Sequence, residues 1–345
     1  MSIVSLAKCA LADTEPTVFN ATNITTEIVN GYKITRFHTK TGIGTRDVSP
    51  MPDGTVWFNG QFSGTVGHLD PKSGRIVLIS LGPGSSPHGQ IPGPDGNIWV
   101  VDGGMDAIVK IYPKTGKFEV YKLPHDPNGE GNINTPAFDR YGKLWFTGQN
   151  GIYGRFDPDT KKFDIFKAPN GFGPYGMATS PDGDIWYTNL AQNKIAHIDP
   201  KTLAIESMDL PESNAGGARR IWADSQGNIY VGTWFTGSIE KYNPKAKNWT
   251  VFKVPGLGPK LYSMYVDKYD NVWVSDFTSS SVWKFDPQNE SFQEFKSPVP
   301  LAQLLEMNGV GESVWGGEQG VDNLIRFQKL PSQDSGKTIQ DYLGQ

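Results

Sequence analysis

Residues whose side chains could bind a ligand or transfer protons occupy six of the seven equivalent positions of a repeated pattern. Each lies eleven positions before a recurring aromatic residue, which we call the anchor aromatic of its repeat. In chain order these seven positions hold Arg46, His88, Asn134, Tyr175, Arg219, Tyr262 and Leu304. Six of them are large and polar or aromatic, whereas a purely structural repeat would favour a single residue type. This variety indicates a site to which each repeat contributes a different group.

A second set of mostly polar residues lies three positions after each anchor aromatic. Its members are Gly60, Asp102, Gly148, Asn189, Thr233, Asp276 and Glu318, with Gln61, Gln149, Asn150 and Gln319 beside them. If both sets face one end of a central tunnel, they surround a polar pocket suited to a small molecule. The alternative is a solvent-filled tunnel mouth, where polar side chains need no partner.

Three carboxylates of the second set favour a divalent cation. Asp102, Asp276 and Glu318, with Asp47 nearby, would supply the oxygen ligands that Mg²⁺ or Ca²⁺ takes in proteins. Whole repeats separate the three acids, so they would approach one ion from different walls of the mouth. We expect no organic cofactor, because no nucleotide-binding loop is present.

The basic residues of the first set suggest a catalytic role. His88 would act as a general base near neutral pH, or serve only as a hydrogen-bonded pocket residue. Arg46 and Arg219 would either form ion pairs with the acids or hold an anionic or carbonyl oxygen of a ligand. Arg220, on the other face of its strand, is expected to be structural. The remaining ligand contacts are predicted at Asn134, Gln149, Tyr175, Asn189, Trp234 and Tyr262.

The anchor aromatics define the repeat that must position these side chains. They are Trp57, Trp99, Trp145, Trp186, Tyr230, Trp273 and Trp315, at spacings of 42, 46, 41, 44, 43 and 42 residues. A turn such as Asp182-Gly183 precedes each anchor, and Asp-Gly between apolar runs predicts a β-hairpin. A period of about 40–45 residues with four strands per repeat predicts an all-β, seven-bladed β-propeller with antiparallel blades. The anchors should pack between blades.

The last repeat contains only three strands of its own. Residues 33–38 resemble the outer strand of the other repeats, so we expect this N-terminal strand to complete the last blade and close the ring. The predicted propeller spans residues 32–328. Residues 1–31 are expected to hold a shortened secretion signal and a loose polar arm, and residues 329–345 a C-terminal tail.

Composition excludes several classes of partner. The net charge is -4, from 32 basic and 36 acidic residues without a basic block, which argues against nucleic acid. Cys9 is the single cysteine, so an internal disulfide is excluded. No apolar run approaches the roughly 18 residues of a membrane span. A closed propeller needs no partner to complete its core, so a monomer is expected.

The start of the chain suggests export. Residues 8–12 before Asp13 resemble the end of a secretion signal, and four glycosylation sequons are compatible with that route. We therefore expect a periplasmic or extracellular protein, with an ordinary disordered start and a cytoplasmic location as the alternative.

The repeated motifs resemble those of the virginiamycin B lyase (streptogramin B lyase) family over residues 33–327. They are Pro-His-Gly or Pro-Tyr-Gly, then Pro-Asp-Gly-x-Ile-Trp, then Asp-Pro-x-Thr-Gly. The resemblance implies a seven-bladed propeller. It also implies Mg²⁺-dependent opening of a cyclic depsipeptide, by elimination across its ester linkage.

The resemblance also implies family site residues, and most of them are replaced here. The family histidine of the sixth blade falls on Tyr262, and the Glu-x-His pair that opens the last blade falls on Ala302-Gln303-Leu304. The acid after the last anchor has a counterpart in Glu318 or, as an amide, Gln319. Two functions therefore compete: a metal-assisted lyase or ester- or lactone-opening enzyme with another substrate, and a non-catalytic exported propeller that binds a small ligand or a partner.

Overall fold

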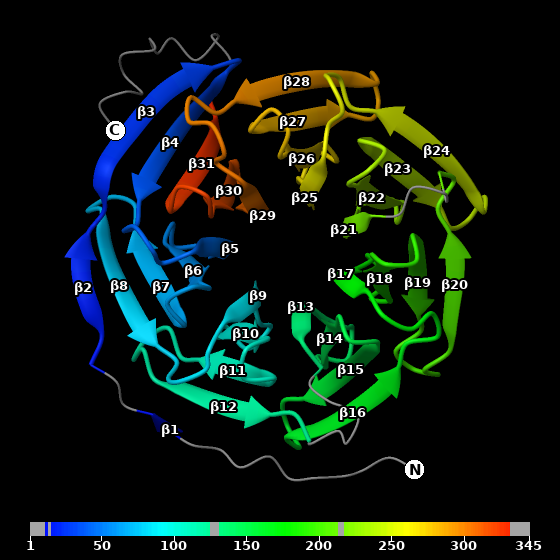
Figure 1. The fold of residues 1–345 in the computed structure, drawn as a ribbon, viewed down its shortest axis with the longest axis horizontal. Helices are drawn as coiled ribbons and strands as arrows, with labels where there is room; N and C mark the ends of the chain where they lie inside the picture. The colour runs from blue at the N-terminus through cyan, green and yellow to red at the C-terminus, as the bar shows by residue number, and fades with distance from the viewer. Residues whose placement is uncertain (1–10, 13–14, 125–130, 213–216, 332–345) are drawn as a thin grey trace.

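Short strands and tight turns build seven antiparallel sheets in the computed structural model, which describes residues 11–12, 15–124, 131–212 and 217–331. The sheets are arranged as blades around a central axis, with the first core strand of each blade innermost (Figure 1). The predicted all-β, seven-bladed propeller is confirmed. None of the described segments is a helix with the length and apolarity needed to cross a membrane.

Each blade has four core strands, numbered outward from the axis. Those of blades one to three are β5 (Thr45–Pro50), β6 (Val56–Gly60), β7 (Thr65–Asp70), β8 (Arg75–Ser80), β9 (Pro87–Pro92), β10 (Ile98–Asp102), β11 (Ala107–Ile111), β12 (Phe118–Lys122), β13 (Ile133–Phe138), β14 (Leu144–Gly148), β15 (Ile152–Asp157) and β16 (Lys162–Lys167). Those of blades four to six are β17 (Pro174–Thr179), β18 (Ile185–Asn189), β19 (Lys194–Ile198), β20 (Ile205–Asp209), β21 (Ala218–Ala223), β22 (Ile229–Thr233), β23 (Ser238–Asn243), β24 (Asn248–Lys253), β25 (Leu261–Val266), β26 (Val272–Asp276), β27 (Ser281–Asp286) and β28 (Ser291–Lys296).

Blade seven joins the two ends of the chain. It contains β29 (Leu304–Val310), β30 (Ser313–Glu318), β31 (Asn323–Lys329) and, as its fourth strand, β4 (Tyr32–His38). Phe37 of β4 pairs with Leu324 of β31, and its ring stacks on the anchor Trp315 with 5.8 Å between centroids. The predicted closure of the ring by the N-terminal strand is therefore confirmed.

Three further N-terminal strands extend the outer edges of blades seven, one and two. They are β3 (Thr22–Val29) on β4, β2 (Thr17–Asn20) on β8 and β1 (Leu11–Ala12) on β12 (Figure 1). The sequence predicted a loose arm without strands here, and the structure corrects this over residues 17–29. The sequence shows no strand period because β2 and most of β3 are exposed, and backbone pairing at a blade edge needs no apolar face. Residues 1–10 of the predicted N-terminal segment, which include Cys9, and residues 332–345 of the predicted tail lie outside the described residues.

A basic side chain on the third strand lies directly opposite every anchor aromatic. In blade order these partners are His68, Lys110, Arg155, His197, Lys241, Lys284 and Arg326. Arg155, for example, lies over the Trp145 ring at 5.6 Å, and His197 stacks on Trp186 at 4.4 Å. These contacts combine burial of the ring with cation–π attraction where the partner is charged, and they explain why the pair recurs in each blade.

The anchor indole also fastens the preceding turn in three of the described blades. Trp145 Nε1 donates to Asp139 Oδ2 at 2.7 Å, and Trp99 and Trp273 donate in the same way to Asp95 and Asp267. Asp139 Oδ1 additionally accepts the backbone N–H groups of Tyr141 and Lys143. One carboxylate therefore holds both the turn and the packing residue in place.

The Asp139→Ala variant is expected to lower the free energy of unfolding by about 2 kcal/mol, because three hydrogen bonds to a charged acceptor are lost. Urea-induced unfolding checks this value. The control is Asp159→Ala in the same blade, where the side chain is exposed, with an expected change within about 0.5 kcal/mol. Equal effects of the two substitutions would contradict the role assigned to Asp139.

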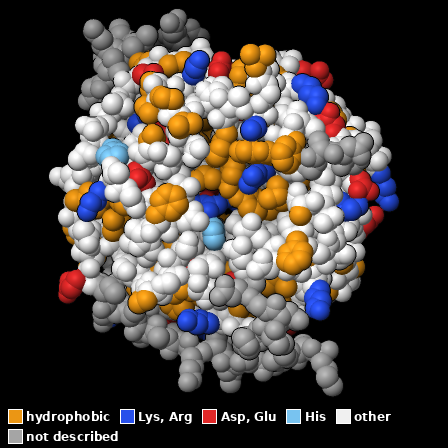
Figure 2. Space-filling view, viewed as in Figure 1, with side chains coloured by type: hydrophobic (Ala, Val, Ile, Leu, Met, Phe, Trp, Pro, Cys, Tyr) orange, Lys and Arg blue, Asp and Glu red, His pale blue; other side chains and the backbone are white. Residues whose placement is uncertain are grey.

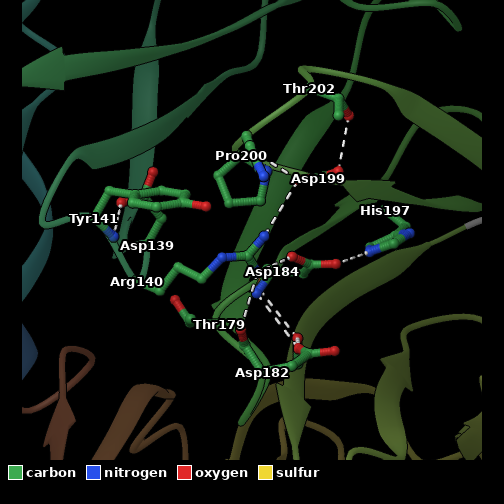
Figure 3. Close-up of polar contacts among 12 residues, drawn as sticks. Asp139, Arg140, Tyr141, Thr179, Asp182, Asp184, His197, Asp199, Pro200 and Thr202 are labelled. Atoms are coloured by element: carbon green, nitrogen blue, oxygen red, sulfur yellow. Dashed lines mark hydrogen bonds and ion pairs between the residues drawn. The ribbon is translucent and has the colours of Figure 1, made fainter.

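Neighbouring blades are also joined at their turns. Arg140, in the β13–β14 turn of blade three, donates Nη1 to Asp184 and to the backbone oxygen of Asp182, and Nη2 to Asp199 (Figure 3). Asp184 in turn contacts His197 Nε2 at 2.7 Å. Arg140 of blade three therefore contacts two turns of blade four, the one between β17 and β18 and the one between β19 and β20.

Candidate functional site

The seven innermost strands begin at the same end of the ring, which we call the tunnel mouth. In every blade the first residue of the innermost strand pairs with the last residue of the second strand, as Pro87 does with Asp102 and Leu261 with Asp276. The two residue sets recognised in the sequence therefore lie at the same end of the ring, as expected. Figure 2 shows a hollow at the ring axis, rimmed by hydrophobic side chains and containing Lys or Arg and His side chains.

The register corrects the first set in blade seven. Leu304 itself pairs with Glu318, so the position equivalent to Arg46 is Leu305, whereas counting back from Trp315 had given Leu304. The hairpin between β29 and β30 is one residue shorter than the others, which shifts the count. The next residue, Glu306, becomes the equivalent of Asp47 and also enters the mouth.

Four buried charged side chains form one network beside the mouth. The Arg220 guanidinium forms ion pairs with Glu306 at 3.0 Å and Asp47 at 3.5 Å, and its Nη1 donates to Thr135 Oγ1 at 2.8 Å. Arg46 Nε donates to Asp47 Oδ1 at 3.0 Å. The groups come from blades one, three, five and seven, so this network ties non-adjacent blades together. Arg220 was expected to be structural, and these contacts fit that role.

A second layer lies closer to the opening and is built around Arg219. Its guanidinium lies 4.5 Å from the Trp234 ring centroid, 4.7 Å from that of Tyr262 and 5.6 Å from that of Tyr175. Phe277 stacks on Tyr262 at 4.8 Å and completes the aromatic wall. We call Arg219 and these four rings the aromatic cradle.

Three arginines at the mouth have a buried nitrogen that makes no hydrogen bond. Arg220 Nε still lies 3.0 Å from Glu306 in an ion pair, whereas Arg219 Nε and Arg46 Nη2 have no acceptor among the described residues. No ion pair to Arg219 is formed within the part of the chain that the structure describes, and its buried Nε has no hydrogen-bond acceptor there. Arg46 Nη2 is likewise buried without a partner, although Nη1 donates to Gln61 Oε1 at 3.0 Å. A buried N–H group of a charged side chain costs free energy when it has no acceptor. The positions next to these two atoms are therefore where an oxygen atom of a ligand would bind.

The mouth carries an excess of positive charge. Among the described residues, the guanidinium groups of Arg46, Arg219 and Arg220 share only the carboxyl groups of Asp47 and Glu306. Burial raises the pKa of Glu306 to about 8, although Arg220 opposes the rise, so its carboxyl group loses negative charge at neutral pH. At least one positive charge is therefore left without a counter-ion.

His88 lies beside these arginines and not among carboxylates. Burial lowers the pKa of His88 to about 3, with Arg46 and Arg220 adding to the effect. The imidazole is therefore neutral at pH 7 and a weak base. This environment does not favour the general-base role predicted from the sequence, which stays a prediction.

The three predicted metal ligands are held in separate hydrogen-bond networks. Asp102 accepts from Ser85 Oγ and the backbone N–H groups of residues 86, 104 and 105, and Asp276 accepts from Ser279 Oγ and the N–H groups of residues 260 and 278. Glu318 accepts from Asn323 and lies 3.6 Å from Arg36. Across the described residues, no three His, Cys, Asp or Glu side chains are grouped to hold a metal. This arrangement does not fit an Mg²⁺ or Ca²⁺ site.

The predicted amide contacts also serve local structure. Asn189 Oδ1 accepts the backbone N–H of Gln192 in the loop after its strand, as Asp102 and Asp276 do in theirs. Asn134 accepts from the Thr135 hydroxyl group. Gln149 lies at the end of β14, and its backbone N–H donates to Asn132. Ligand binding by these three residues stays a prediction, whereas Arg46, Tyr175, Arg219, Trp234 and Tyr262 are brought together at the mouth.

Sequence reasoning missed Glu306, Phe277 and Leu305. Leu305 packs with Tyr175 and Tyr262 in one apolar cluster at the mouth. The sequence did contain a signal for Glu306. Asp47, Arg220 and Glu306 are charged residues that each follow the first-set position of their blade by one residue, provided that the shorter hairpin of blade seven is taken into account.

Comparison with known proteins identifies the family. The sequence model of the virginiamycin B lyase family matches residues 17–283. The chain belongs to the virginiamycin B lyase family. The predicted resemblance is thus confirmed, while no curated protein matches the chain.

Solved structures of virginiamycin B lyases share the propeller. The selenomethionine-substituted virginiamycin B lyase from Staphylococcus aureus is 18% identical with a TM-score of 0.77, covering 91% of this chain and 99% of that one. A catalytically inactive variant of the S. aureus lyase with quinupristin gives 18% and 0.79, covering 86% and 99%. A streptogramin B lyase gives 20% and 0.76, covering 86% and 97%. At these identities the matches show the fold.

The family residues implied for the start of blade seven are replaced in this chain. Leu304, where the resemblance implied a histidine, accepts no proton. Any reaction at this mouth therefore has to use other groups.

Proposed function

We propose that the tunnel mouth binds a small molecule that carries a carboxylate or a similar anionic oxygen group next to an apolar part. The observation that supports this most directly is Arg219, a cation held between aromatic rings without an ion-pair partner among the described residues. A carboxylate would accept from its unused Nε and from Arg46 Nη2, since guanidinium groups match planar carboxylates. The rings of Trp234 and Tyr262 would contact the apolar part.

Metal-assisted opening of an ester or lactone is less well supported at this mouth. The donor set of Asp102, Asp276 and Glu318 is spread over three local networks, so we derive no step through a metal ion. Elimination itself remains the second candidate function, because the chain belongs to a family whose solved members are called lyases.

Binding of benzoate, compared with uncharged benzamide, tests the proposal. We expect benzoate to quench the fluorescence of Trp234, and Arg219→Gln to weaken its binding at least tenfold, which corresponds to about 1.4 kcal/mol. The reason is the loss of charge-assisted hydrogen bonds. Isothermal titration calorimetry at two salt concentrations gives the affinities.

Arg155→Gln is the matched control, because Arg155 also lies over a tryptophan but in the body of blade three. It should leave benzoate binding unchanged. Failure of the wild type to bind benzoate more tightly than benzamide, or equal affinities for wild type and Arg219→Gln, would overturn the proposal.

A further inference from the structure

A second cavity lies on the outer part of blade seven. It is bordered by β3, β4, β31 and the connection between β28 and β29 (Figure 1). Its volume of about 350 Å³ is within the range of small-molecule sites. Its walls contain no residue of the aromatic cradle or of the charged network beside the mouth. A ligand of this cavity would therefore use other residues than the anion proposed above.

A bulge in β3 lies beside this cavity. The pairing of β3 with β4 shifts register between Thr22 and Thr25, and Asn23 adopts a left-handed backbone conformation with a φ of 47°. A bulge bends its strand and changes the direction of its side chains. Asn23 and Thr25 line the cavity from β3, and Pro298 and Val299 line it from the connection before β29. The cavity is thus formed by features that the other blades do not share.

Arg36 of β4 lines the cavity and departs from the pattern of the repeat. It pairs with Ile325 of β31. The equivalent residues of the other fourth strands are Leu78, Val120, Ile165, Ser207, Val251 and Glu294. Four of these six are apolar, so the packing of a blade does not require a guanidinium group here. The departure indicates a role for Arg36 other than packing.

The hydrogen bonding of Arg36 is incomplete. The residue is only 6% exposed, and its one hydrogen bond among the described residues runs from Nη1 to Glu27 Oε1 at 2.6 Å. Its buried Nε lies 3.6 Å from Glu318 Oε1, which is too long for a hydrogen bond. The remaining N–H groups of a buried guanidinium favour an acceptor. An oxygen atom of a ligand in the cavity would supply one.

The charges beside the cavity favour a ligand without net charge. The guanidinium group of Arg36 is within ion-pair distance of both Glu27 and Glu318. An anion would be repelled by these two carboxylates, and a cation would be repelled by the guanidinium group. This balance contrasts with the mouth, where Arg219 has no ion-pair partner among the described residues.

The other walls combine hydrogen-bonding groups with an apolar surface. His38 Nδ1 lies 3.2 Å from Asn323 Oδ1, so the neutral ring donates there and leaves Nε2 as an acceptor. Pro298, Val299 and Val321 supply the apolar part. A sugar ring matches both, because its hydroxyl groups donate and accept hydrogen bonds while its C–H groups pack on apolar side chains.

We propose that this cavity binds a single neutral hexose ring. Arg36 donates to a hydroxyl oxygen of the sugar, and His38 Nε2 accepts from a neighbouring hydroxyl group. Pro298 and Val299 contact the C–H face of the ring. The protein then carries two sites of different chemistry: an anion site at the tunnel mouth and a neutral sugar site on the outer part of blade seven.

Saturation-transfer NMR with D-glucose, D-galactose, D-mannose and N-acetyl-D-glucosamine tests the proposal. We expect the wild type to bind at least one of these four sugars. His38→Ala should weaken that binding at least about fivefold, because one hydrogen bond is lost. Lys167→Ala is the matched control, since Lys167 holds the position of His38 in blade three, and it should stay within about twofold.

Arg36→Met should weaken sugar binding at least about tenfold, because hydrogen bonds from a charged group are lost. Urea-induced unfolding establishes whether this variant is folded, and His38→Ala decides the question if it is not. Benzoate should not displace the sugar, and His38→Ala should leave benzoate binding unchanged. The absence of saturation transfer to all four sugars, equal affinities of wild type and His38→Ala, or displacement of the sugar by benzoate would each overturn the proposal. None of these results bears on whether benzoate binds at the mouth through Arg219.

Discussion

The Arg220→Met variant is expected to lose about 3–5 kcal/mol of unfolding free energy. Removal of this guanidinium leaves Glu306 and Asp47 buried with Arg46 as their remaining cation, and breaking a buried ion pair from one side strands an uncompensated charge. The Thr135 hydroxyl group also loses the donor from Arg220, although it still donates to Asn134. Urea-induced unfolding at pH 8 measures the loss.

The loss should be nearly constant between pH 5 and pH 7 and grow above about pH 8. Burial raises the pKa of Glu306 to about 8 although Arg220 opposes the rise, so this carboxyl group is protonated at pH 5 with or without Arg220, and only at higher pH does Arg220 stabilise its ionised form. The double variant Arg220→Met with Glu306→Gln should be more stable than the sum of the two single effects predicts. Strict additivity would contradict the coupling seen in the structure.

Arg155→Met is the control for this prediction. It removes an arginine from a partly exposed ion pair with Asp164, and such pairs contribute at most about 1 kcal/mol. A comparable loss in both arginine variants would show that the Arg220 effect is not caused by burial of its partners.

The Glu240→Val variant is expected to be more stable than the wild type above neutral pH. Glu240 is fully buried in β23, and neither carboxylate oxygen has a hydrogen-bond partner among the described residues. Its pairing with Val231 places the side chain on the face of blade five that packs against blade four. The six equivalent positions of the other blades hold Gly67, Val109, Gly154, Ala196, Trp283 and Ile325. A valine is therefore compatible with this place in a blade.

The sign of the effect follows from the raised pKa. Burial, with a smaller contribution from Glu212, raises the pKa of Glu240 from 4.5 to about 7 in the folded protein. Below about pH 4.5, Glu240 is protonated in both the folded and the unfolded protein, so it does not lower the free energy of unfolding. As the pH rises from there through about 7, the unfolded protein loses this proton more readily, and the free energy of unfolding falls. The ionised form should then cost about 2–3 kcal/mol at pH 8. Urea-induced unfolding of wild type and variant between pH 5 and pH 9 should show a difference that grows with pH.

Two controls separate charge from packing. Glu240→Gln keeps the shape and removes the charge, so its stability should show the same flattened pH dependence as the valine variant. Glu206→Gln alters an exposed carboxylate of blade four and should stay within about 0.5 kcal/mol of the wild type at each pH. A constant difference between wild type and Glu240→Gln over this pH range would rule out a buried ionising carboxyl group.

The seven-bladed ring was predictable because it depends on local patterns that repeat. The anchor spacing and the Asp-Gly turns are visible in the sequence, and each reports a backbone conformation or a packing position that every blade must adopt. Closure of the ring by residues 33–38 was predictable because the last repeat has only three strands of its own and needs a fourth. The outer strands β2 and β3 were not predictable in the same way, because an edge strand pairs through its backbone and shows no apolar alternation.

The candidate site was predictable only in part, because side-chain direction is not encoded by residue type. Arg219 and Tyr175 point to the axis, whereas Asp102 and Asp276 turn into the loops that follow their strands. An aspartate that caps a loop and one that binds a metal look identical in a sequence. Glu306 was missed for a different reason, since one residue fewer in a hairpin shifts every position counted from its anchor.

The closure of the ring by β4 has a consequence for how the chain acquires its structure. His38 and Asn323, which contact each other in blade seven, are 285 residues apart in the chain. Blade seven therefore stays incomplete until the strand β31, which ends at Lys329, has been synthesised, whereas blades one to six pair strands that are adjacent in the chain. Contacts between such distant segments form slowly, because the ordering of the intervening chain precedes any gain from pairing. We therefore expect the joining of β4 to β31 to be a late and slow step of folding, which leaves the edges of these two strands unpaired until it occurs.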